Sequence, residues 1–300
     1  MRVYRYESSD RPGGPRVAIA ASGGDPVDLG DVWPDGGDVL GSVAAIIERG
    51  PELWSEISDR VAATSTEPID ESSSIRWLTP LDRLSSLRDF LAFEDHVVRG
   101  AERRGTAVPE RWYRAPVYYK GNHRSIIGPD EPCRRPAYTS YLDFELELAM
   151  VVGRRGRDIE PSEAGSYIFG FTVMNDFSAR DVQAEEMSAW LGPAKGKDFA
   201  TALGPCIVTT DELGAEPDLE MICRVNGTEW GRSRSGTARW KWADMIAHVS
   251  ADEDIYPGDV YGSGTPGGCC GLDIGRRLET GDVVELEIEG IGILRNEVVP

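Results

Sequence analysis

The sequence predicts an α+β fold: a mixed β core, rolled or sandwiched and interrupted by few helices, with a small N-terminal α/β unit before it. Residues 138–300 alternate short apolar segments with glycine and proline, which is typical of such a core. No glycine-rich nucleotide fingerprint follows a predicted strand, which argues against a doubly wound α/β sheet. Residues 1–80 have a different, turn-rich pattern, so we expect two domains, 1–80 and 81–300.

The N-terminal unit contains few regular patterns. Residues 17–21 form a short apolar run between turns and predict a strand. Residues 43–47 and their neighbours predict a helix that ends near Gly50 and Pro51, because these residue types interrupt helices. The polar stretch 64–74 predicts a linker to the larger domain.

The larger domain begins with a predicted helix at residues 85–98. Ser86 and Asp89 have the spacing of a capping box, and Gly105 follows two arginines as a helix end. Further along the chain, short apolar runs predict strands at 170–173, 206–209, 221–225, 259–261 and 283–288.

Residues 141–152 are the most informative segment. In a strand, alternate side chains point to opposite faces, and the even-numbered positions here are all apolar. The opposite face starts with three carboxylates, Asp143, Glu145 and Glu147. If protein covers that face too, these groups cannot all stay ionised without a cation, and oxygen ligands favour a hard divalent metal. The alternative is an amphipathic strand whose acidic face lies in water.

Composition excludes several classes of partner. The formal net charge of −19 argues against nucleic acid and against an anionic membrane surface, because both require a basic surface. The first residues contain no apolar run, so no signal peptide is expected, and no segment is long enough to span a membrane. Five cysteines without a C-x-x-C motif fit reduced thiols better than disulfides or a zinc site, which predicts a cytoplasmic protein.

Three further segments carry polar groups that packing alone does not favour. His96 lies two helical turns after Asp89 in the predicted helix, so the two side chains share a face; the plain alternatives are a helix cap and a buried histidine. Asp176 follows an apolar run and either points into a cleft or caps the next helix. Lys195 and Lys197 lie in a glycine-containing loop and either contact an anion or lie in solvent.

Together these segments resemble the fumarylacetoacetate hydrolase family over roughly residues 85–298. The likeness rests on motifs in a fixed order: Asp89 seven residues before His96, Glu145-x-Glu147, Met174 to Gln183, Gly192 to Lys197, Ser263 to Thr265, and Gly290 to Asn296. The resemblance implies the β core of that family and a role for each matching residue.

The roles implied by the resemblance are of three kinds. The metal ligands would be Asp89, Glu145, Glu147 and Asp176. His96 would be the general base, oriented by Asp273 where the family usually has glutamate, with Glu279 as the other candidate partner. Substrate oxygens would be held by Tyr119, Arg180, Gln183, Lys197 and Thr265. Of these, Lys197, Arg180 and Gln183 could also stabilise an oxyanion during catalysis.

The implied function is a divalent-metal-dependent hydrolase that cleaves a carbon–carbon bond in an acylpyruvate-like or β-diketo acid. His96 would activate water, and Mg²⁺ or Ca²⁺, with Mn²⁺ as a further candidate, would stabilise the resulting enolate. The same site could instead serve a tautomerase or isomerase, a decarboxylase or a dehydratase of a 2-oxo or enol acid.

A third alternative is a catalytically silent binding protein. It is suggested by Leu91 where the family often has tyrosine, by Asp273, and by the adjacent Cys269 and Cys270. The expected partners are a small anionic dicarbonyl or enol-acid substrate and a second copy of the chain in a homodimer.

Overall fold

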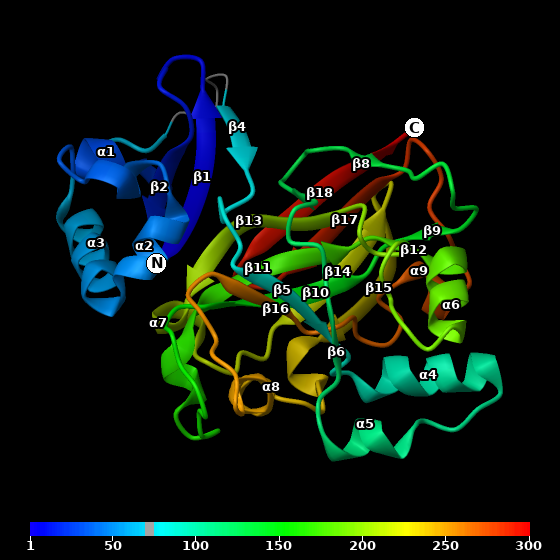
Figure 1. Cartoon of the computed structure of the whole chain (residues 1–300). Helices are drawn as coiled ribbons and strands as arrows, with labels where there is room; N and C mark the ends of the chain where they lie inside the picture. Colours follow the sequence, from blue (N-terminus) through cyan, green and yellow to red (C-terminus); the bar gives the residue numbers. More distant parts are fainter. Residues whose placement is uncertain (70–74) are drawn as a thin grey trace.

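The computed structural model describes residues 1–69 and 75–300, and Figure 1 shows them as one body built around β-sheets. A large sheet has the strand order β3-β2-β1-β13-β11-β10-β16-β5-β6, with β4 beside β1 and β7 beside β13. A five-stranded sheet has the order β15-β14-β17-β18-β8, and β12 pairs with β9 alone. The predicted fold class is confirmed: strands dominate, helices are short, and the N-terminal portion mixes both.

The bounds of the elements are as follows. The strands are β1 Arg2–Ser8, β2 Arg16–Ala20, β3 Val27–Asp28, β4 Ile75–Leu78, β5 Ser86–Phe90, β6 Tyr118–Lys120, β7 Ile126–Ile127, β8 Cys133–Arg134, β9 Leu142–Asp143, β10 Leu146–Val152, β11 Ile168–Asp176, β12 Ser178–Ala179, β13 Thr201–Thr209, β14 Glu220–Val225, β15 Thr228–Arg234, β16 Asp259–Gly262, β17 Val283–Ile288 and β18 Gly292–Val299. The α-helices are α1 Leu29–Val32, α2 Val43–Arg49, α3 Pro51–Ala63, α4 Glu94–Arg104, α5 Glu110–Arg114, α6 Arg180–Ser188, α7 Thr210–Leu213, α8 Trp242–Ser250 and α9 Gly271–Ile274.

The main hydrophobic core lies between the large sheet and the five-stranded sheet. Side chains of β10, β11 and β13, such as Leu148 and Phe171, pack with side chains of β14, β17 and β18, such as Met221 and Leu286. Strands β10 and β11 are buried along their whole length. Burial on both faces stabilises these central strands and places any polar group on them inside the protein.

The N-terminal portion extends the large sheet. Strand β1 pairs antiparallel with β13 through Arg2 and Val3, so hydrogen bonding continues from the N-terminal strands into the core strands. Helices α2 and α3 bury a second apolar cluster against this side of the sheet. The predicted strand at 17–21 and the predicted helix at 43–47 are confirmed as β2 and α2, whereas α3 was not predicted. The domain division near residue 80 stays a prediction, and the last five residues of the predicted linker lie outside the described residues.

The predicted helix at 85–98 is wrong for its first half. Residues Ser86–Phe90 form strand β5, which pairs parallel with β16 and antiparallel with β6, and only α4 is helical. Asp89 therefore caps no helix, and it does not share a helical face with His96. A strand buried on both faces shows no alternation of apolar and polar residues, which explains why its pattern resembled a helix. Gly105 does end α4, in a left-handed conformation at φ 64°.

The remaining predicted strands are confirmed, with one break. Segments 170–173, 206–209, 221–225, 259–261 and 283–288 lie within β11, β13, β14, β16 and β17. The single strand predicted at 141–152 is instead two, β9 and β10, separated by Phe144 and Glu145. This break matters for the site, because it separates Asp143 from the two carboxylates that follow it.

Candidate active site

Four carboxylates from three strands and one strand junction converge in the core of the large sheet. Asp89 lies on β5, Glu147 on β10, Asp176 at the end of β11, and Glu145 directly before β10. Strand β16 separates β5 from β10, and its Gly262 pairs with Asp89. A Cβ atom at Gly262 would lie 2.6 Å from Asp89 Oδ1 and 2.7 Å from Glu147 Oε2, so the missing side chain makes room for both carboxylates.

The cluster has the properties of a cation site. One oxygen from each of the four carboxylates lies within 4.8 Å of the others, and no member is more than 6 % exposed. Three buried oxygens, Asp89 Oδ1, Glu147 Oε1 and Asp176 Oδ1, have no hydrogen-bond partner among the described residues. Buried carboxylate oxygens without donors are costly, and an oxygen-only set of this kind suits a hard divalent ion. The residues present therefore fit the metal that the sequence predicts.

The pKa values of the cluster carboxylates also favour a cation site. Burial, together with the neighbouring Asp176, raises the pKa of Asp89 well above its usual range. Burial and Asp89 do the same to the pKa of Glu147. The charged forms of these two groups are thus disfavoured until an opposite charge enters the cluster.

Two cations already contact the other side of the cluster. Lys197 is buried, and its Nζ donates to Glu145 Oε2 at 2.7 Å and to Asp176 Oδ2 at 2.5 Å. Arg180 Nη2 lies 2.8 Å from Glu145 Oε1. Although burial opposes ionisation, Arg180 and Lys197 lower the pKa of Glu145, and His96 adds a smaller effect from nearby. The Tyr119 hydroxyl donates to Asp176 Oδ2 at 2.8 Å.

Asp143, the first carboxylate of the predicted acidic face, does not join the cluster. It accepts hydrogen bonds from Arg180 Nε at 2.8 Å and from the backbone amides of Gly271 at 2.7 Å and Leu272 at 2.9 Å. It therefore anchors Arg180, whose Nη1 also donates to Gln183 Oε1 at 3.1 Å. The sequence did not predict this anchoring role, because nothing in the pattern distinguishes Asp143 from Glu145 and Glu147.

A histidine–carboxylate pair lies beside the cluster. His96 Nδ1 is 2.9 Å from Asp273 Oδ2, whereas Glu279 forms ion pairs with Arg135 and Arg277 at the surface. Although burial opposes ionisation of Asp273, its contacts with His96 hold its pKa at about 2. An ionised Asp273 suits the tautomer of His96 that carries its proton on Nδ1, and that tautomer presents Nε2 as the basic nitrogen.

The sequence missed a second partner of Asp273. Arg103 Nη1 donates to Asp273 Oδ1 at 2.8 Å. Arg103 and His96 lie seven residues apart in α4, so they share a helical face, and this spacing could have indicated the contact. Thr265, predicted to hold substrate, donates its hydroxyl proton to the Cys269 carbonyl oxygen at 3.1 Å. Next to it, the backbone amide of Gly264 donates to Glu147 Oε2 at 2.9 Å.

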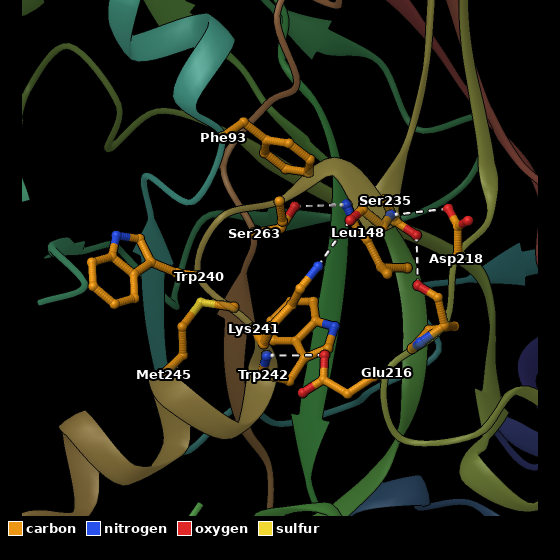
Figure 2. Close-up of a pocket in the computed structure, with 13 residues that line it drawn as sticks. Phe93, Leu148, Glu216, Asp218, Ser235, Trp240, Lys241, Trp242, Met245 and Ser263 are labelled. Atoms are coloured by element: carbon orange, nitrogen blue, oxygen red, sulfur yellow. Dashed lines mark hydrogen bonds between the residues drawn. The ribbon is translucent and has the colours of Figure 1, made fainter. Parts of the chain in front are cut away.

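A cavity of about 280 Å³ lies on the opposite side of β10, and Figure 2 shows its lining. Leu148 contributes to its wall, and because it follows Glu147 in the strand it points away from the carboxylates. The Glu216 carboxylate in the wall accepts the backbone amides of Trp242 and Ala243 at the start of α8. The cavity contains none of the predicted site residues, and this acidic group serves to cap a helix.

The fold and the site define a class of protein: an enzyme built around a buried carboxylate cluster with an adjacent histidine–aspartate pair. A family model described as "Fumarylacetoacetate (FAA) hydrolase C-terminal" matches residues 86–299. The chain belongs to this family.

Relatives match over the whole chain. The sequence is 32 % identical over 307 residues to "Oxaloacetate tautomerase Fahd2a, mitochondrial" from Rattus norvegicus, covering 100 % of this chain and 92 % of the rat protein. It is 31 % identical over 308 residues to "Oxaloacetate tautomerase fahd2, mitochondrial" from Xenopus laevis, covering 100 % of this chain and 90 % of that protein.

Solved structures share the fold. The fumarylacetoacetate hydrolase from Exiguobacterium antarcticum is 27 % identical with a TM-score of 0.77, covering 100 % of this chain and 99 % of the other. The 5-carboxymethyl-2-hydroxymuconate delta-isomerase from Mycobacterium smegmatis is 28 % identical with a TM-score of 0.70, covering 100 % of this chain and 98 % of the other. Similar structures thus include both a hydrolase and an isomerase.

All five cysteines are free and buried. Across the described residues, no helix combines the length and the apolar character that a membrane crossing requires.

Proposed function

We propose that this protein is a metal-dependent tautomerase that interconverts the keto and enol forms of oxaloacetate or a similar 2-oxo diacid. The observation that carries the proposal is the His96–Asp273 pair beside four buried carboxylates with unpartnered oxygens. Keto–enol exchange requires one positioned base and one electrophile, and this arrangement supplies both. The full-length similarity to oxaloacetate tautomerases favours this reaction over the carbon–carbon bond hydrolysis that the sequence predicts first.

The metal ligands in this proposal are Asp89, Glu145, Glu147 and Asp176. Mg²⁺ and Ca²⁺ are the preferred ions for an all-oxygen set, and Mn²⁺ is a further candidate. When bound, such an ion would polarise the keto oxygen of the substrate and so acidify the neighbouring C–H bond.

Each remaining residue has a role that follows from its contacts. Asp273 keeps the Nδ1 proton of His96 in place, so Nε2 takes the proton from the carbon next to the keto group and returns it in the reverse direction. Lys197 and Arg180 supply positive charge next to the developing oxyanion. Tyr119, Gln183 and Thr265 are proposed to hold the substrate's oxygens.

The test is a comparison of two assays on the same preparation. The decay of enol-oxaloacetate, followed by ultraviolet absorbance in a buffer that does not coordinate metals, should accelerate with protein and Mg²⁺ and slow again with a chelator. His96→Gln should lower this rate by about 10²–10⁴-fold, the usual contribution of a general base. Asp273→Asn should lower it too, because asparagine does not stabilise the required imidazole orientation and charge.

Hydrolysis is the second candidate, supported by family membership and by the hydrolase among the similar structures. In that reaction His96 would activate water, and an acylpyruvate would release pyruvate. Pyruvate release together with an unchanged rate of enol decay would refute the tautomerase proposal. A decarboxylase would instead release carbon dioxide, and a dehydratase would remove water from its substrate. A silent binding protein would accelerate neither enol decay nor pyruvate release.

Two further expectations remain proposals. We expect a homodimer, for which sedimentation should give about twice the chain's mass of 32.8 kDa. We also keep the cytoplasm as the proposed compartment, although the names of the rat and frog relatives place those proteins in mitochondria.

A further inference from the structure

Cys270 lies where the candidate active site meets the α9 turn. It directly precedes α9, its backbone forms an isolated β-bridge with Glu145, and its side chain is buried. Its Sγ atom, one ring nitrogen of His96 and one carboxylate oxygen of Asp273 all lie within 4.8 Å of one another. Three different ligand types therefore converge here: Cys270 and Asp273 from either end of one short segment, and His96 from a distant helix.

We propose that His96, Cys270 and Asp273 form a second metal site, specific for a thiophilic divalent cation such as Zn²⁺ and separate from the four-carboxylate cluster. Zinc binds nitrogen and oxygen at about 2.0–2.2 Å and sulfur at about 2.3 Å. Tetrahedral ligands at those distances lie roughly 3.3–3.6 Å apart, so the three atoms have to move by little more than 1 Å. Three protein ligands would leave the fourth position for water.

The chemistry of the ligands separates the two sites. The carboxylate cluster offers only hard oxygen atoms, which suit Mg²⁺ or Ca²⁺. The second site offers a thiol and an imidazole, which select zinc-like ions. Binding replaces the thiol proton with the metal–sulfur bond, and the proton leaves to solvent.

The charges facing this site are balanced while Arg103 stays in place. Asp273 on α9, Asp143 on β9 and Glu145 before β10 contribute three carboxylates, against the guanidinium groups of Arg103 on α4 and Arg180 on α6 and the ammonium group of Lys197 on Glu145. Release of Arg103 leaves one carboxylate to offset the charge of a metal. Arg103 is 34 % exposed, so it can release Asp273 Oδ1 and turn toward solvent when a metal arrives. Arg180 keeps its two contacts with Asp143 and remains in place.

The neighbouring Cys269 provides a matched control. Its thiol interacts with that of Cys223, and both side chains belong to the main hydrophobic core. The two adjacent cysteines thus have the same loop and the same burial, but only Cys270 lies beside His96 and Asp273.

Occupation of the second site would inhibit the enzyme, a consequence that rests on the proposed function. Because a metal on His96 occupies a ring nitrogen and draws Asp273 away from it, His96 can no longer accept a proton from the substrate. Zn²⁺ would then act as an inhibitor that does not compete with Mg²⁺.

The site itself is tested by spectroscopy on the full chain, without turnover. Co²⁺ added in the presence of excess Mg²⁺ should give a near-ultraviolet thiolate-to-cobalt absorption band in the wild type and in Cys269→Ser, but not in Cys270→Ser. Zn²⁺ should abolish the band by displacement, and its affinity should fall at least tenfold in Cys270→Ser and in His96→Gln. A wild type without the band, or a band that persists in Cys270→Ser, would overturn the proposal.

The inhibitory role is tested separately, by adding Zn²⁺ to the tautomerase assay at saturating Mg²⁺. Inhibition of the wild type and of Cys269→Ser, with resistance in Cys270→Ser, supports it. Equal inhibition of all three proteins means that zinc acts at the carboxylate cluster and refutes the role. If no tautomerase activity is found but the cobalt band follows Cys270, the proposed function fails while the metal site stands.

Discussion

The buried carboxylate of Asp28 and the four-carboxylate cluster have opposite surroundings. In the N-terminal portion, Asp28 accepts two hydrogen bonds from Arg16 at 2.6 Å, one from the Tyr6 hydroxyl at 2.5 Å and one from the Gly30 amide at 2.8 Å. In the four-carboxylate cluster, three equally buried oxygens have no partner among the described residues. The pKa of Asp28 is lowered by Arg16 despite burial, whereas that of Asp89 is raised by burial and by Asp176.

The difference teaches how to separate a structural carboxylate from a ligand. A buried carboxylate with donors on both oxygens is complete within the folded chain and stabilises it. A buried carboxylate with free lone pairs beside other carboxylates lowers stability until a cation arrives. Substitution of Asp28 and substitution of a cluster carboxylate should therefore have opposite effects on stability.

The largest effect is expected for Glu147→Gln. Loss of one ligand should reduce turnover by at least about 10³-fold, because metal activation of the substrate contributes several kcal/mol. In a chelator the variant should melt at a higher temperature than the wild type, because an amide removes the free-energy cost of burying a carboxyl group beside three others, and Mg²⁺ should no longer raise its Tm. Calorimetry with and without Mg²⁺ measures the two Tm effects, with Glu229→Gln at the exposed surface as the control. A lower Tm in the chelator would contradict the comparison.

Lys197→Met tests whether the cluster depends on its own buried cation, because it removes the ammonium group that pairs with two of the four carboxylates. Its ammonium contacts Glu145 and Asp176, so its loss should destabilise the metal-free protein by about 3–5 kcal/mol, the cost of breaking a buried ion pair. Turnover should fall by about 10²–10³-fold if Lys197 also stabilises the oxyanion. The matched control is Lys195→Met, because Lys195 lies two residues earlier and its side chain is exposed. Unchanged Tm without metal would mean that Lys197 is not the counter-ion of the cluster.

Asp28→Asn tests the structural side of the comparison. Asparagine loses the paired hydrogen bonds to Arg16, so the free energy of unfolding should fall by about 1.5–3 kcal/mol, the usual value for hydrogen bonds to charged groups. Turnover at saturating Mg²⁺ should not change, and Mg²⁺ should raise Tm by the same amount as in the wild type. Any loss of the Mg²⁺ effect would show that Asp28 is coupled to the four-carboxylate cluster.

The smallest effect concerns pH. Because the folded-state pKa of Asp28 lies below its unfolded value of about 3.9, the stability that Asp28 contributes is complete above that value. It is lost as the pH falls through the folded pKa. The Tm difference between the wild type and Asp28→Asn should thus be constant from about pH 7 to 5 and shrink below about pH 4. A difference that grows with acidification would contradict the assigned direction.

Much of the molecule could be predicted from local pattern. Strands such as β17 follow from short apolar runs between turn residues, and the candidate ligands follow from ordered motifs. The prediction failed at β5, where burial on both faces removes the alternation that identifies a strand. It also could not separate Asp143, which anchors Arg180, from Glu145 and Glu147, because the break between β9 and β10 is not encoded in the alternation.

The sequence alone determined the residue types of the site, their order and the family, because those depend on spacing along the chain. The tertiary structure decided which groups meet. Asp273 lies 177 residues from His96, and Lys197 lies 52 residues from Glu145, yet each pair is within hydrogen-bond distance. The approach of Cys270 to His96 could not be predicted from the sequence either, because metal-ligand spacing rules consider only nearby positions. Contacts of this kind depend on strand pairing and sheet order, which bring distant segments together and which no local pattern specifies.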